Sequence, residues 1–233
     1  MRADVQPAGS RAFYLAMMAA VTVVILYGFS HTLQSDVLNP PQRQPLILYV
    51  HAVVYTGWLL LLMAQAALVR VRNLRLHRTL GLFGAGFAAA MVAIGIATTV
   101  VMGRIQVQRM GLEAGMFIYR PIEDITFFAA AVGLAVHWRR RPDFHRRAIV
   151  LAACALTPPA ISRIPGIHSL GAVYVGTDLL VMVAILHDLV TLRRVHEVYR
   201  YGLGIAVPGQ AALLLVLANR PEPFLALVSF ITQ

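Results

Sequence analysis

The chain has 233 residues, 59% of them hydrophobic and 13% charged, and its mean hydropathy of +0.71 excludes an ordinary soluble domain. Its formal net charge of +10 comes from arginines clustered at the ends of apolar runs, which predicts contact with anionic lipid headgroups and not with nucleic acid. The chain contains no lysine and a single cysteine, Cys154, so a retinal Schiff base and an intramolecular disulfide are both excluded.

Apolar runs of membrane-spanning length recur along the whole chain. The first, at residues 12–29, has no small-x-small cleavage pattern after it, so we interpret it as an uncleaved span and not as a signal peptide. Six further runs lie at residues 46–69, 80–102, 122–138, 147–164, 170–192 and 203–218. The sequence therefore predicts an all-α, polytopic transmembrane bundle of about seven spans, with residues 1–233 forming one domain.

The second run carries its polar groups on one side. At 100° per residue, one wedge of about 80° contains five side chains, namely His51, Tyr55, Trp58, Leu62 and Gln65. We expect this face to contact protein and not lipid. Four arginines and His77 follow before the next run opens at Leu80, so residues 51–81 predict a helical hairpin with a basic turn.

Later runs differ in their helix-breaking and small residues. The third run is rich in glycine and alanine, which favours close helix packing and predicts that this is the central helix. In the fifth run, Pro158 and Pro159 predict a kink or an end just before Arg163. The last apolar stretch, residues 224–231, is too short to cross, and we expect it at the outer interface.

The arginines also predict the orientation of the spans. Residues 70–78, 139–147 and 193–200 are basic and form alternate connections, so they share one side of the membrane. The positive-inside rule assigns that side to the cytoplasm. The N-terminus is then inside and the C-terminus outside.

Polar side chains within the predicted spans are the strongest functional signals, because each is costly in a bilayer unless it is paired. We assign seven of them to one pocket in the outer half of the membrane: His51, Tyr55, Trp58, Gln65, Asp124, Arg163 and Asp178. Glu123 lies at a similar depth, and Arg163 is expected to pair with Asp124 or Asp178. The alternative is a structural network that holds the helices together without binding a ligand.

A second group of candidates lies at the cytoplasmic face. It comprises three histidines from three connections and one carboxylate: His77, His145, Asp188 and His196. This ligand set suits zinc or iron if the connections converge. The alternative is that these histidines contact headgroups or cap helix ends.

A b-type haem is the third hypothesis. His51 can supply one axial ligand, with His31 or His168 as the second. His187 faces away from Asp178 on its helix, and His137 faces away from Asp124 on its own. This orientation argues against a haem held between His187 and His137.

Two motifs carry a family resemblance. His51, Trp58 and Gln65 form an H-x6-W-x6-Q span, and His77 begins an HRxLG turn that ends at Gly81. With these motifs the chain resembles a group of uncharacterised bacterial multi-span membrane proteins. The likeness extends through residues 141–147, Arg163, Asp188 and residues 195–196, and it implies a multi-helix inner-membrane protein without an assigned activity.

Two further resemblances concern chemistry. The HRxLG turn is similar to one in cytochrome b561-like and ferric-reductase-like proteins, although their paired in-membrane histidines are not clearly present here. The topology and cytoplasmic-face histidines resemble those of alkaline-ceramidase-like hydrolases, whose paired histidines on the last span are missing. The sequence thus leaves three functions open: a membrane protein that binds a small molecule or metal, a haem electron-transfer protein, and a scaffold or accessory subunit.

Overall fold

A computed structural model of the chain describes residues 8–232, and every regular element in that range is helical. The described helices are α1 (Ala8–Ser30), α2 (Leu46–Arg70), α3 (Leu74–Met110), α4 (Tyr119–His137), α5 (Pro142–Cys154), α6 (Pro158–Ile161), α7 (Leu170–Leu192), α8 (Glu197–Asn219) and α9 (Glu222–Thr232). Two short segments, η1 (Gln34–Leu38) and η2 (Leu112–Ile118), complete them. The predicted all-α fold is confirmed.

Five of the described helices are long and apolar enough to cross a membrane: α1 from Arg11 onward, α2, α3, α7 and α8. Their exposed side chains are largely apolar, as lipid contact requires. Helix α4 and the α5–α6 pair occupy the places of the fourth and fifth predicted spans, but α5 has only 13 residues. The chain is therefore a helical membrane protein.

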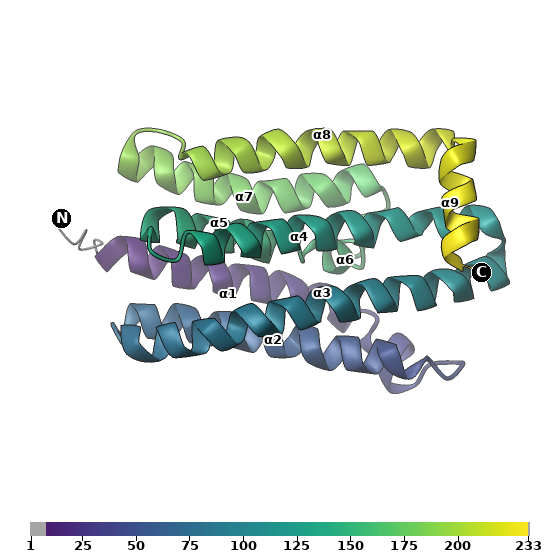
Figure 1. Cartoon of the computed structure of the whole chain (residues 1–233), viewed down its shortest axis with the longest axis horizontal. Coiled ribbons are helices and arrows are strands. Elements are labelled where there is room, and N and C mark those ends of the chain that lie inside the picture. Colours follow the sequence, from purple (N-terminus) through teal and green to yellow (C-terminus); the bar gives the residue numbers. More distant parts are fainter. Residues whose placement is uncertain (1–7, 233) are drawn as a thin grey trace.

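The long helices lie side by side, and the basic connections gather at one end (Figure 1). The turns from α2 to α3, from α4 to α5 and from α7 to α8 lie at the end where α1 begins. We call this the basic end. Helix α9 lies across the opposite end, which we call the α9 end.

The predicted hairpin of α2 and α3 is confirmed. Helix α2 ends at Arg70, the chain turns through Arg72 at a φ of 62°, and the side chain of Asn73 caps α3 by accepting from Leu76 N at 3.2 Å. At 1.5 Å per residue the 37 residues of α3 extend about 55 Å, well beyond a hydrocarbon core of about 30 Å. The helix therefore continues past the predicted span of residues 80–102.

The break in the fifth span lies where the two prolines predict it. Helix α5 ends at Cys154 and α6 begins at Pro158, since Pro158 and Pro159 have no amide hydrogen to continue the helix. Thr157 Oγ1 donates to Cys154 O at 2.7 Å and lies 3.2 Å from Thr177 Oγ1 on α7. A buried carbonyl freed by the break is thus satisfied within the protein.

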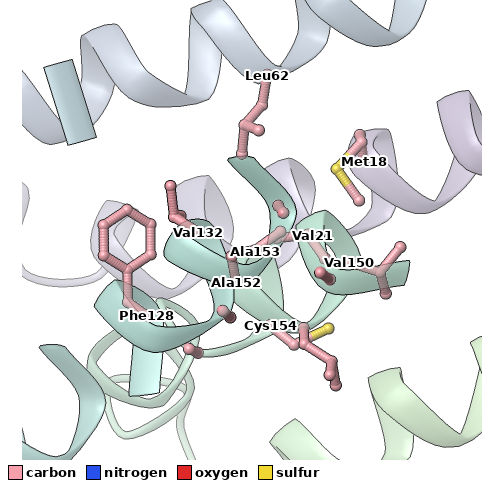
Figure 2. Packing of buried hydrophobic residues seen from close by; sticks show 14 of the residues in the cluster. Met18, Val21, Leu62, Phe128, Val132, Val150, Ala152, Ala153 and Cys154 are labelled. Atoms are coloured by element: carbon pink, nitrogen blue, oxygen red, sulfur yellow. The ribbon is translucent and has the colours of Figure 1, made fainter. Parts of the chain in front are cut away.

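Helix α5 is the most enclosed helix of the bundle. Figure 2 shows its Val150, Ala152, Ala153 and Cys154 among side chains from α1, α2 and α4. It packs against α1, α4, α7 and α8. Small side chains along α5 allow these four neighbours to approach closely.

The third predicted span is not the central helix. Helix α3 buries Gly84, Ala88 and Gly95 against its neighbours, but Leu82 and Phe83 are 80% and 62% exposed. It packs mainly against α2, α4 and the segments η2 and α9. Its glycines and alanines therefore serve packing at the edge of the bundle, and α5 takes the central place.

The C-terminal apolar tail forms α9, which packs against η2 and α3. Val228 is fully buried with Met116 and Ile118, and Tyr119 Oη donates to Phe224 O at 2.7 Å. Arg220, between α8 and α9, pairs with Glu113. The tail thus folds across the end of the bundle and does not add a further crossing.

Candidate functional site

Two of the predicted pocket residues, Asp124 on α4 and Asp178 on α7, line the same cavity together with Glu123. The cavity lies between α4, α5, α6, α7 and α8 and has a volume of about 40 Å³. Its other walls are largely apolar, with Phe127 and Leu151 among them. We call it the acid cavity. Its volume is enough for a few water molecules or for a small polar group.

Partners from two helices hold the carboxylates of the acid cavity. Tyr174 Oη donates to Glu123 Oε2 at 2.5 Å, and Gln210 Nε2 donates to Asp178 Oδ1 at 3.2 Å. Asp124 differs, because its Oδ2 is buried and makes no hydrogen bond within the described residues. A buried acceptor without a donor is costly, so Asp124 is the carboxylate best placed to accept a hydrogen bond from a ligand.

Tyr174 and Gln210 were not among the predicted site residues. Tyr174 lies one helical turn before Asp178, which places the two on the same face of α7. Gln210 is a polar residue within the predicted span of residues 203–218. Both signals are present in the sequence, but neither shows which carboxylate the side chain binds.

His51 and Tyr55 lie beside this site but do not line the cavity. Their rings stack at 3.9 Å between centroids, and Tyr55 Oη donates to Met91 O at 3.1 Å. Gly95 makes this possible, since a Cβ there would overlap Tyr55 Oη. Tyr55 is close enough to Asp124 to interact with it electrostatically. Tyr55 therefore lies near Asp124, and neither ring lines the acid cavity.

Trp58 and Gln65 do not close or floor the cavity. Trp58 is buried among core aromatics, edge-on to Phe128 at 5.4 Å between centroids. Gln65 lies further along α2, where its Nε2 would lie 3.5 Å from a Cβ on Gly81 near the basic end. The H-x6-W-x6-Q face thus spreads over the depth of the bundle.

Arg163 does not pair with Asp124 or Asp178. It follows α6, and its guanidinium donates to Pro159 O at 2.6 Å and to Thr32 Oγ1 at 3.1 Å. Its carboxylate neighbour is Asp36 in η1, at 3.9 Å. Arg163 therefore ties the connection after α1 to the broken helix.

The predicted metal ligand Asp188 is fully engaged in a buried ion pair. Arg147 Nε and Nη2 donate to its two oxygens at 2.7 and 2.6 Å, and the two side chains are 1% and 0% exposed. Such a fork leaves little lone-pair capacity for a metal. Arg147 was predicted only as part of a basic connection, because the sequence does not reveal that its side chain turns inward.

His196 caps α8. Its Nδ1 accepts from Val198 N at 3.3 Å, and its Nε2 lies 3.6 Å from Asp143 Oδ2. Burial lowers the pKa of the His196 imidazole, and the Arg147 guanidinium lowers it further. A neutral ring is consistent with Nδ1 acting as an acceptor. This matches the helix-capping alternative for His196.

His77 and His145 lie close to each other but do not form a cluster with Asp188 and His196. Their ring centroids are 6.3 Å apart, and His145 Nδ1–H donates to Ala135 O at 2.8 Å. Across residues 8–232 no group of three or more histidine, cysteine, aspartate or glutamate side chains could hold a metal ion. The predicted zinc or iron cluster is therefore not supported.

The histidines considered for a haem each have their own neighbours. His51 stacks on Tyr55, His31 lies edge-on to Tyr27 at 4.8 Å between centroids, and His168 lines a separate cavity. His187 stacks on Phe13 at 3.7 Å between centroids. None of these contacts favours a bis-histidine haem.

Fold and site together define a class of protein: a helical membrane bundle with carboxylates around an internal cavity. The cavity lies between helices from the second half of the chain, and the α5–α6 break forms part of its wall. Comparisons of the chain with family models, curated proteins and solved structures give no match.

Proposed function

We propose that the chain is a seven-span protein of the bacterial inner membrane, with its N-terminus in the cytoplasm and its C-terminus outside. In this topology α4 and the α5–α6 pair supply the fourth and fifth crossings. The position of the three arginine-rich turns at one end of the bundle supports it, because such turns are retained in the cytoplasm. The acid cavity then lies in the outer half of the membrane.

We propose further that the acid cavity binds a small molecule through a primary ammonium group. The observation that carries this proposal is the convergence of Glu123, Asp124 and Asp178 on one small cavity, with Asp124 Oδ2 left without a protein donor. An ammonium group brings three donors and one positive charge, so it complements these acceptors. Apolar walls such as Phe127 and Leu151 would contact the rest of the ligand.

Thermal unfolding of the purified full-length protein in detergent, with methylammonium as the probe, tests this function, because this ion is small enough for the cavity. Ligand at 100 times its Kd adds about 2.7 kcal/mol to the free energy of unfolding, or roughly 5–10 °C in Tm for a chain of this size. We expect such a rise for the wild type and its loss in Asp124→Asn and Asp178→Asn.

Glu222→Gln is the matched control, because it removes one exposed carboxylate outside the cavity. We expect it to respond to methylammonium as the wild type does. The proposal fails if methylammonium leaves the wild-type Tm unchanged, or if both cavity variants keep the full shift.

A further inference from the structure

A second cavity lies toward the α9 end of the bundle, separate from the acid cavity. It has a volume of about 150 Å³ and is lined by Arg120, Ser162, Ile167, His168, Ser169 and Val173, among others. A protein cavity of this volume accommodates benzene, so there is room for about six non-hydrogen atoms. We call it the Arg120 cavity.

Arg120 is the unusual residue of this cavity. Its side chain is partly buried, yet Nε and Nη2 are buried and make no hydrogen bond within residues 8–232, and the guanidinium makes no ion pair there. Other arginines near this end have protein partners: Arg104, Arg109, Arg163 and Arg220. A guanidinium so placed favours an acceptor from outside the chain.

The start of α7 adds donors to the same cavity. Ser169 caps this 23-residue helix, and its Oγ accepts from Ala172 N at 3.1 Å, which leaves its hydroxyl hydrogen free to donate. Helix N-termini attract negative charge, and the first turn of α7 holds no acidic side chain. His168, which is exposed, can donate from its ring.

The surrounding charges do not neutralise Arg120 by direct pairing. Glu123 and Asp124 interact with it electrostatically, but both line the acid cavity instead. Arg163 is a second positive charge within electrostatic reach of Arg120. The Arg120 cavity therefore combines cationic and hydrogen-bond-donating groups with apolar walls from Ile167 and Val173.

We propose that the Arg120 cavity binds a small oxyanion that carries a short apolar chain, with a short-chain carboxylate as the best fit. The oxyanion meets the Arg120 guanidinium and the Ser169 hydroxyl, and the chain contacts Ile167 and Val173. A lipid phosphate offers the same oxyanion chemistry from the membrane side. This site is independent of the acid cavity, since it takes the opposite charge and a different set of side chains.

Isothermal titration of the full-length protein in lipid-free detergent tests the site with two probes, butyrate and inorganic phosphate. Butyrate has six non-hydrogen atoms and matches the cavity in size. We expect saturable binding of butyrate, with at least a tenfold loss of affinity in Arg120→Gln. Arg109→Gln is the matched control, because Arg109 lies toward the same end but outside the cavity. We expect this variant to bind butyrate with the affinity of the wild type.

A second variant guards against misfolding of Arg120→Gln. Ile167→Phe keeps the guanidinium and fills the cavity, and we expect it to weaken butyrate binding while the Tm without ligand stays close to that of the wild type. If inorganic phosphate binds, phosphate is the oxyanion and the site is supported. The same holds if only phosphatidylglycerol stabilises the wild type and Arg120→Gln loses that stabilisation. The proposal is overturned if neither butyrate, inorganic phosphate nor phosphatidylglycerol binds, or if Arg109→Gln loses as much affinity as Arg120→Gln.

Discussion

At the residue scale, the cost of a buried charge decides which polar side chains stabilise this bundle. Arg147 and Asp188 are both buried and meet through two hydrogen bonds, so each depends on the other. Arg194 lies at the same end of the bundle but is exposed. Removing one partner of a buried pair leaves the other charge without compensation.

We therefore predict that Arg147→Ala destabilises the protein far more than Arg194→Ala. The expected losses are about 3–5 kcal/mol for the buried pair and under about 1 kcal/mol for the exposed arginine. Thermal unfolding of both variants in the same detergent measures the difference. Equal Tm values would show that Asp188 finds another partner or becomes neutral.

The same scale shows which site residues the sequence can predict. Predicted depth places Asp124 and Asp178 at one level, and in the structure both line the acid cavity. His51 and Gln65 share a face, but 14 residues of helix separate them by about 21 Å along the axis, so they belong to different levels. Arg163 follows a helix break, where the direction of the side chain depends on tertiary packing.

At the element scale, the apolar runs predict the long helices well, because length and hydropathy suffice for a membrane-spanning helix. The central position of α5 was not predicted, since glycines on α3 and alanines on α5 give similar signals for close packing. Gly28 on α1 shows how close such packing becomes. A Cβ at this residue would overlap the backbone carbonyl of Ala160 on α6.

We predict that Gly28→Ala destabilises the contact between α1 and α6 by roughly 1–3 kcal/mol, as overpacking does elsewhere. Gly86→Ala on α3 is the control, because a Cβ there meets no atom within 4 Å. It should be neutral or slightly stabilising, since alanine is the better helix former. Denaturation of the two variants in parallel would refute the close contact if Gly28→Ala were as stable as Gly86→Ala.

At the scale of the whole molecule, the charges divide the bundle into two ends with different roles. The basic end gathers arginines and the buried Arg147–Asp188 pair, which favours contact with anionic headgroups and a structural role. The acid cavity and the Arg120 cavity lie away from that end, on parts of α4 and α7 nearer to α9. A ligand from outside the cell would reach both cavities only if the α9 end faces outward.

Reporter fusions that distinguish cytoplasm from periplasm test this orientation most directly. Fusions after Arg78, Arg141 and Arg194 should report the cytoplasm, and a fusion after Gln233 should report the periplasm. The fusion after Arg141 tests the crossings of α4 and the α5–α6 pair, because it would report the periplasm if only the five long helices crossed. A periplasmic signal after Arg141 or a cytoplasmic signal from the C-terminal fusion would contradict the seven-span count. A periplasmic signal after Arg78 would place both cavities on the cytoplasmic side.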